Sequence, residues 1–310
     1  MKKTDNPSVT ACVPTYCEPE KVTSYLRSCR NVKYKPFRVI IVNANPGDDT
    51  SKIIEQEKQC VDYELIEISG ENNEFWSASV NRGLKEILRT SDLRDWILIT
   101  NIDIEFDQDV VSSLIAKALE YNRCQIGALS LFNGVALSSG TKVKSWITSL
   151  TIHPFAGKTK SDIPDNLCIQ VDYLPTRCML IPVEAVTTVG LIADKLLPHY
   201  GADHEFSHRL HRSGYIPYIY TGACIEVDMR NTGKSLYFKK SNFFARLLNL
   251  MSIRNPSNPW YRTILVLLIF PWYAWPTAIL AYLFRTLIEL FFSKDFIERN
   301  FGSLERGYSS

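Results

Sequence analysis

The 310-residue sequence lacks features that would point to several classes of protein. Its formal net charge is only +2, which argues against a nucleic-acid-binding protein that acts through bulk charge. Its eight cysteines include no C-x-x-C pair and no zinc-finger spacing, so we expect reduced thiols rather than disulfides or structural zinc. No apolar segment precedes Pro7, and we therefore expect no cleaved secretory signal and an amino end that begins in the cytosol.

Repeats and low-complexity linkers are absent from the first half of the chain, where short β-branched runs alternate with helical stretches. This alternation is typical of an α/β fold in which helices flank a doubly wound, mostly parallel sheet. A further strand, and a short helix that opens after Pro182, are predicted within residues 171–190. The strands predicted in the first half are residues 9–16, 37–44, 63–69, 96–100 and 125–132.

Polar side chains follow each of the first four predicted strands, and no glycine-rich phosphate loop with a basic residue follows the first strand. In a doubly wound sheet the ligand crevice lies beyond the carboxyl ends of the strands, so these side chains would converge on one site for a ligand rich in hydroxyls and phosphates. The alternative is that they only cap helices. The four groups are Thr15, Tyr16 and Glu18, then Asn43, Asn45 and Asp48, then Glu71, Asn72 and Asn73, and finally Asn101, Asp103, Glu105 and Asp107.

The fourth strand ends at Asn101 and Asp103, whose side chains point the same way in an extended chain. A carboxylate and an amide oxygen on one face form a hard-oxygen site that suits Mg²⁺ or Mn²⁺, and such an ion would itself bridge phosphates. The spacing therefore offers a divalent-metal site as one alternative and helix capping as the other.

Five motifs, in their expected order, resemble those of the family-2 glycosyltransferases with the GT-A fold, over about residues 9–233. They are VPTYCEPE for the nucleotide-holding loop, IIVNANPGDDT at the second strand, ENNEFWSASVNRGL for N-x-G-x-x-x-A-x-N-x-G, TNIDIEFD for the D-x-D metal motif, and LPHYGADHEFSHRLHRSGY for the acidic motif. The resemblance implies a rhamnosyltransferase-like, inverting enzyme that uses a nucleotide-sugar donor and Mg²⁺ or Mn²⁺. It also implies metal ligands at Asp103, Asn101 and Asp228, and donor contacts at Pro14, Tyr16, Glu18, Asn43, Asn73, Trp76, Asn81, Asn101, Ile102 and Arg177.

Two positions depart from the family pattern. Asn101 stands where D-x-D has its first acid, which predicts a weaker metal site or an ion that arrives mainly with the diphosphate. Asn43 stands where the family carries a base-reading Asp, although an amide can both accept and donate hydrogen bonds. Trp76 is either a wall of the donor pocket or the apolar start of a helix, and Arg177 is either a diphosphate or sugar contact or a surface ion pair.

The predicted helix from Asp203 to Arg212 holds two candidates for the general base that takes the proton of the acceptor hydroxyl. Asp203 and Glu205 point to different faces of this helix, so only one can face the acceptor. Spacing alone favours Asp203 as an ordinary N-cap, but the family motif implies that it is the base and that Glu205 supports it or pairs with Arg209. Three histidines on the helix lack a further ligand in register and are expected to be surface or packing residues rather than zinc ligands: His204, His208 and His211.

Acidic residues are missing from Arg230 to Arg262, a stretch with seven basic residues. Residues 263–284 then carry no charge. As one helix they could cross a hydrocarbon core of ~30 Å, whereas Pro271 and Pro276 could break them into two shallow helices, and packing against the domain is a third alternative. One helical stripe in the basic stretch predicts a membrane-surface helix, with Phe244, Leu247, Leu248 and Met251 on it.

The sequence therefore predicts a GT-A catalytic domain in residues 1–233 and a membrane-associating helical region in residues 234–310. The predicted function is transfer of a sugar to a glycan or lipid-linked acceptor at the cytoplasmic face of a membrane, in cell-surface polysaccharide synthesis, with the chain peripheral or anchored by residues 263–284. No nucleic-acid partner is expected. The alternatives are a nucleotidyltransferase, which the missing glycine-rich loop argues against, a catalytically silent sugar-nucleotide-binding module, and a purely structural membrane-anchored protein.

Overall fold

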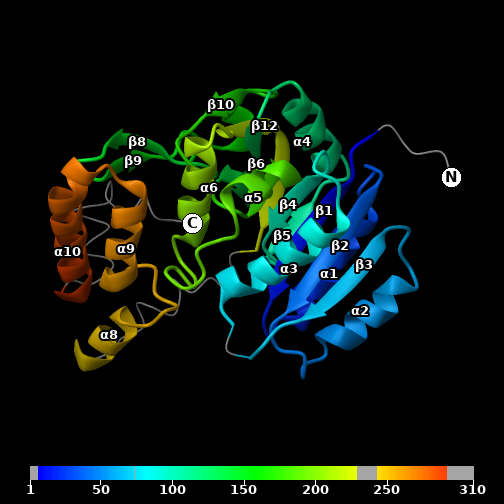
Figure 1. The fold of residues 1–310 in the computed structure, drawn as a ribbon, viewed down its shortest axis with the longest axis horizontal. Helices are drawn as coiled ribbons and strands as arrows, with labels where there is room; N and C mark the ends of the chain where they lie inside the picture. The colour runs from blue at the N-terminus through cyan, green and yellow to red at the C-terminus, as the bar shows by residue number, and fades with distance from the viewer. Residues whose placement is uncertain (1–5, 73, 229–242, 292–310) are drawn as a thin grey trace.

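The computed structural model describes residues 6–72, 74–228 and 243–291 of the chain. The predicted boundary between residues 233 and 234, and the predicted donor contact Asn73, lie outside these residues. Within the described residues the predicted α/β class is confirmed, because helices lie on both faces of a central sheet (Figure 1).

A ten-stranded sheet forms the centre of the described chain, and a separate hairpin consists of β8 (Lys142–Ser145) and β9 (Leu150–Ile152). The strands of the main sheet are β1 (Val9–Thr15), β2 (Phe37–Asn43), β3 (Glu64–Ser69), β4 (Trp96–Thr100), β5 (Ile104–Phe106), β6 (Cys124–Phe132), β7 (Val135–Ala136), β10 (Cys168–Gln170), β11 (Cys178–Pro182) and β12 (Ile216–Val227). Their order is β10-β12-β6-β11-β4-β1-β2-β3, with β5 paired to β12 and β7 to β6. Strands β3, β2, β1 and β4 are parallel, as are β6 and β12, while β11 runs antiparallel between β4 and β6. The five strands predicted in the first half are confirmed as β1, β2, β3, β4 and β6.

Helices cover both faces of this sheet, so most strands are apolar on both sides. The first face is covered by α1 (Pro19–Arg30), α2 (Thr50–Lys58) and α4 (Val110–Leu119), and the second by α3 (Trp76–Thr90), α5 (Val183–Val189) and α6 (Ala202–Arg212). In β1, Ala11 and Val13 belong to the core on the first face and Cys12 to the core on the second, because successive side chains of a strand point to opposite faces. A short 3-10 helix, η1 (Lys160–Asp162), lies outside these layers.

A very close contact between α3 and β1 positions one side of the site described below. A Cβ atom at Gly83 of α3 would come within 2.3 Å of the Cys12 sulfur, so only glycine permits this approach. The contact brings Trp76 and Ser79, in the first turn of α3, close to the end of β1.

The C-terminal region forms α8 (Phe243–Leu250), α9 (Pro259–Ile269), a 3-10 turn η2 (Trp272–Ala274) and α10 (Trp275–Phe291), which lie together at one end of the molecule (Figure 1). Residues 263–284 are therefore not one continuous helix. Helix α9 ends at Ile269, ahead of Pro271, because proline disfavours a helical conformation in the residue before it. Pro276 is tolerated because it lies in the first turn of α10. In the part of the chain that the structure describes, no helix has both the length and the apolar character that crossing a membrane requires.

Candidate active site

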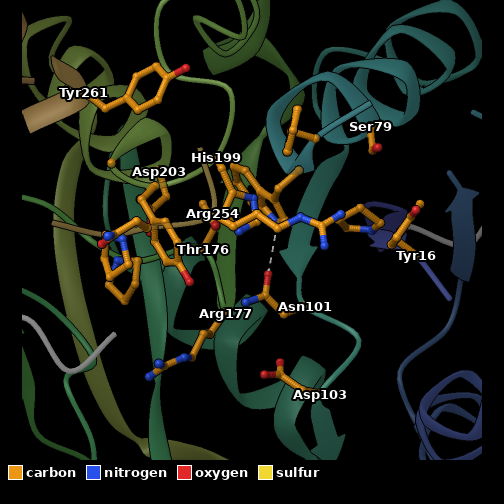
Figure 2. A pocket seen from close by; sticks show the side chains of 18 of the residues that line it. Tyr16, Ser79, Asn101, Asp103, Thr176, Arg177, His199, Asp203, Arg254 and Tyr261 are labelled. Atoms are coloured by element: carbon orange, nitrogen blue, oxygen red, sulfur yellow. Dashed lines mark hydrogen bonds between the residues drawn. The ribbon is translucent and has the colours of Figure 1, made fainter. Parts of the chain in front are cut away.

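A cavity of about 660 Å³ lies beyond the carboxyl ends of β1 and β4 (Figure 2). Its walls come from the loops after these strands, the start of α3, the segment before β11, the start of α6 and the C-terminal helices. The polar residues after β1 and β4 thus converge on one crevice as expected, whereas those expected from β2 and β3, namely Asn45, Asp48, Glu71 and Asn72, do not line it. The predicted site residues that line the cavity are Pro14, Tyr16, Glu18, Trp76, Asn101, Ile102, Asp103, Arg177 and Asp203.

Asn101 and Asp103 line the same cavity, as expected from their spacing. The Asn101 side-chain oxygen accepts a hydrogen bond from the Trp76 indole N–H at 3.2 Å (Figure 2). Trp76 is both the first residue of α3 and a wall of the cavity, so both alternatives proposed for it hold. The Asp103 Oδ1 atom is buried and has no hydrogen-bond partner in the described part of the chain. Burial raises the pKa of the Asp103 carboxyl, although the charges of Arg177 and Lys21 act in the opposite direction.

Arg177 lies in the loop before β11 and is buried in the cavity wall, with only 7% of its surface exposed. The alternative of a surface ion pair is therefore wrong. Its Nη1 atom has no hydrogen-bond partner among the described residues. Burial lowers the pKa of the guanidinium, and the nearby carboxylates of Asp103 and Asp203 oppose this effect. A buried arginine with unused donors is well suited to hold an anion such as a phosphate.

Asp203 stands in the first turn of α6 and lines the cavity, whereas Glu205 is not among the lining residues. The Glu205 carboxylate accepts two hydrogen bonds from Arg209, with distances of 2.7 Å from Nε and 3.1 Å from Nη2. The predicted pairing of Glu205 with Arg209 is thus confirmed. The N-cap residue of α6 is Gly201, so the interpretation of Asp203 as the N-cap is wrong.

His199 and Tyr200, just ahead of α6, complete this wall of the cavity. Burial lowers the pKa of His199 to about 4, with a smaller contribution in the same direction from the positive charge of Arg254. The ring of His199 is therefore neutral at physiological pH, and its buried Nδ1 has no partner in the described residues. The family motif contains His199, but the sequence gives no reason to select it over the three histidines of α6.

The C-terminal region supplies a further wall, which the membrane interpretation of this stretch does not predict. Arg254, between α8 and α9, extends across the cavity and places its guanidinium carbon 5.4 Å from the ring centre of Tyr16 (Figure 2). Tyr261 of α9 and Tyr282 of α10 also line the cavity. The sequence signal that could have found Arg254 is the acid-free basic stretch, because such a stretch suits an anionic ligand as well as a membrane.

Two predicted donor contacts, Asn43 and Asn81, do not line the cavity. The Asn43 side chain is completely buried, accepts a hydrogen bond from the Asn45 N–H at 3.0 Å and donates one to Glu67 at 3.1 Å. The Asn81 amide bonds both the N–H and the carbonyl of Ile192, each at 2.9 Å. Both amides are thus occupied by hydrogen bonds within the protein. Asn43 stabilises the loop after β2, and Asn81 stabilises the start of the segment after α5.

Two of the three predicted metal ligands, Asn101 and Asp103, line the cavity. Asp228 does not line the cavity, although its N–H donates to the Asp103 carbonyl at 2.8 Å and so braces the end of the metal motif. No group of three or more His, Cys, Asp or Glu side chains in the described residues could hold a metal ion. The buried Oδ1 of Asp103 is one strong ligand and the Asn101 oxygen a second that is shared with Trp76. This set fits an ion such as Mg²⁺ that takes one or two ligands from protein and the others from substrate phosphates.

The three histidines of α6 each contact a different partner. The His204 ring packs on Tyr173 with 4.8 Å between ring centres, and the His208 ring contacts Trp146 at 5.9 Å. His211 Nδ1 is 3.0 Å from the carbonyl oxygen of Asp172. The contacts of His208 and His211 agree with the expected packing roles, whereas His204 also lines the cavity.

Comparison with known proteins identifies one matching family model and one similar curated protein. The sequence model of glycosyl transferase family 2 matches residues 10–162. A galactofuranosyl glycosyltransferase of Leishmania donovani is 20% identical over 257 residues, which are 73% of this chain and 53% of that protein. The chain thus spans about half the length of this curated relative.

Two solved structures share the architecture. Residues 1–349 of TarS from S. aureus superpose with a TM-score of 0.54 at 11% identity, covering 97% of this chain and 80% of that one. GalNAc-T7, crystallised with UDP, GalNAc and Mn²⁺, superposes with a TM-score of 0.59 at 10% identity, covering 99% of this chain and 59% of that one. At such identities the likeness concerns the fold. Residues 10–162 thus match the model of glycosyl transferase family 2, and the described chain shares the α/β fold of the GT-A glycosyltransferases TarS and GalNAc-T7.

Proposed function

We propose that this chain is an inverting glycosyltransferase that moves a sugar from a nucleoside-diphosphate donor to an acceptor hydroxyl. The observation that carries the proposal is a set of buried polar atoms in the walls of one cavity that have no hydrogen-bond partner among the residues the structure describes: Thr15 Oγ1, Asp103 Oδ1, Arg177 Nη1 and His199 Nδ1. Buried polar atoms are almost always bonded in a folded protein, so such a cluster indicates a place where a polar ligand completes the bonding.

The donor diphosphate would lie between the end of β4 and Arg254. Sugar transfer leaves negative charge on the departing diphosphate, and Arg177, Arg254 and Lys21 are among the positive groups in the cavity that can stabilise it. A divalent ion held by Asp103 and Asn101 would neutralise the same charge. The crystallised relative GalNAc-T7 contains UDP and Mn²⁺, which makes a uridine nucleotide and Mn²⁺ the first choices to test.

The acceptor hydroxyl would approach from the side of α6, where Asp203 takes its proton. Asp203 lines the cavity and Glu205 is bound to Arg209, so the helix presents one acidic side chain to the cavity. A base that removes a proton from the acceptor, without itself attacking the sugar, leads to a single displacement and therefore to inversion at the anomeric carbon. His199 would hold a sugar or phosphate group as a neutral hydrogen-bonding partner.

The proposed acceptor is a glycan or a lipid-linked molecule at the cytoplasmic face of a membrane, in the synthesis of a cell-surface polysaccharide. The exposed apolar side chains of α8, α9 and α10 support this location.

The test is a panel of nucleotide sugars, each assayed for release of the nucleoside diphosphate with Mn²⁺ and again with EDTA. We expect release from at least one donor and a large loss of rate with EDTA. Binding of a donor with no release under any condition would favour the catalytically silent binding module. Release of pyrophosphate from a nucleoside triphosphate and a sugar phosphate would instead identify a nucleotidyltransferase.

A further inference from the structure

Exposed apolar side chains are concentrated on the C-terminal helices. Of the twenty-two large hydrophobic residues that are exposed in the described chain, thirteen lie between Phe244 and Phe291. Leu248 of α8 is 77% exposed and Trp272 of η2 is 75% exposed. Soluble monomers rarely leave so many apolar side chains together in water, so this surface calls for a partner.

Each of the three helices is apolar on its outer side and contacts the rest of the protein with its inner side. On α9, Trp260 and Leu267 are exposed while Tyr261 and Leu265 line the cavity. On α10, Leu280, Phe284 and Leu287 are exposed at helical spacing, whereas Tyr282 faces the cavity. On α8 the exposed residues are Phe244, Leu247 and Leu248, and Leu250 is buried.

The β8–β9 hairpin extends the apolar surface beside α10. Its Ile147 and Leu150 are exposed, and Arg285 of α10 donates to the carbonyl of Thr148 at 3.5 Å. The hairpin also carries the exposed Lys142 and Lys144. We call the outer sides of α8, α9, η2 and α10 together with this hairpin the apolar face.

The charged side chains at the described part of the apolar face are mainly basic. No aspartate or glutamate occurs between Phe243 and Ile288, and the face carries Arg246, Arg285 and the hairpin's Lys142 and Lys144. In a two-fold dimer formed through this face the same basic groups would meet one another and repel, because both partners contribute the same patch. Anionic lipid headgroups complement them. Exposed tryptophan and tyrosine, here Trp260, Trp272 and Tyr273, are the side chains that favour the boundary between lipid and water.

We propose that the apolar face docks on the surface of an anionic lipid bilayer. The same helices wall the cavity, and a helix with its side chains is about 10 Å across, so docking brings the cavity within roughly one helix diameter of the lipid. The acceptor hydroxyl is then carried by a molecule held in that membrane, a consequence that rests on the proposed function. Docking itself is independent of the chemistry.

Sedimentation of the full chain with vesicles tests this proposal. The vesicles consist of phosphatidylcholine with about one third phosphatidylglycerol, and the comparison is with pure phosphatidylcholine. The test variant is Leu280→Glu with Phe284→Glu, and the matched control is Leu119→Glu, which adds a carboxylate at a leucine of α4 that is 61% exposed. Circular dichroism and thermal unfolding show whether each variant is folded.

We expect wild type and Leu119→Glu to bind the anionic vesicles equally, and the double variant to lose at least tenfold in partitioning. No binding by wild type, or equal binding by the double variant, would overturn the proposal. The proposal would also be overturned if the wild-type protein were a dimer that did not bind vesicles and that the same two substitutions converted to monomers. A second copy of the chain would then cover the apolar face. Release of nucleoside diphosphate in the panel assay, with water as the sugar acceptor, needs no vesicles, so failure of the docking proposal and failure of the proposed function can be distinguished.

Discussion

The Asp103 carboxylate is buried at the end of β4, and burial raises its pKa. The ionised group therefore lowers the stability of the folded protein at neutral pH. Asp103→Asn should raise the urea midpoint of unfolding at pH 7, and this gain should shrink as the pH falls through the pKa of Asp103, where the wild-type carboxyl becomes neutral. The same variant should lose roughly 100-fold or more in donor turnover, because a ligand for the diphosphate-bound ion is gone. A less stable variant with unchanged turnover would contradict the assignment of this residue.

Arg254 lines the cavity although it lies well beyond the recognised motifs in the sequence. If it holds the donor diphosphate, Arg254→Ala should weaken binding of the nucleoside diphosphate by about tenfold, the usual loss for a hydrogen bond to a charged group. Arg246→Ala is the matched control, since Arg246 of α8 bonds the Leu290 carbonyl at 3.4 Å and does not line the cavity. Titration calorimetry with UDP and Mn²⁺ measures both. Equal affinities of the two variants for UDP would show that Arg254 does not bind the donor diphosphate.

Among the elements, α9 packs directly against the start of α6. Gly201 has a φ of +82° and a Cβ atom there would come within 3.0 Å of Leu265, whereas Gly157 has the same φ with no atom within 4 Å. Gly157→Ala should therefore cost only the strain of the left-handed conformation, roughly 1 kcal/mol, and leave transfer unchanged. Gly201→Ala should cost more and also lower the transfer rate, because Asp203 follows two residues later. Urea unfolding and donor turnover of both variants check this, and equal effects would show that α9 does not hold α6 in place.

Over the whole molecule, buried histidines should make the stability depend on pH. Burial lowers the pKa of both His199 and His208 from 6.5 to about 4, so the unfolded chain binds more protons than the folded chain between these values. Stability is then lost as the pH falls from above 6.5 towards 4, by up to about 3 kcal/mol for each histidine. Asp103 acts in the opposite direction, so the comparison is between wild type and His208→Gln, a substitution outside the cavity. The variant should show a shallower fall in unfolding free energy between pH 7 and 4.5, and identical slopes would contradict the burial argument.

The sequence predicts the sheet well because most of its parallel strands are largely apolar runs with polar residues at their ends. The family motifs also predict that Asn101, Asp103 and Asp203 share one site, whereas the sequence leaves Arg177 open between a donor contact and a surface ion pair. It does not separate Asn43 and Asn81 from true lining residues, because an amide that bonds backbone groups and one that bonds a ligand look the same in a sequence. Nor does it place Arg254, whose position depends on how α8 and α9 fold back over the sheet.

The central claim is that this cavity transfers a sugar with Asp203 as the base, and paired substitutions on α6 test it most directly. Asp203→Asn keeps the shape of the side chain but cannot accept the proton, while Glu205→Gln changes a carboxylate that is bound to Arg209 and lies outside the cavity lining. Donor affinity and transfer rate are measured for both with the donor that the panel identifies. The account predicts unchanged donor affinity in Asp203→Asn with a fall in transfer of roughly two to four orders of magnitude, and a much smaller effect of Glu205→Gln. A greater loss of transfer in Glu205→Gln than in Asp203→Asn would contradict it.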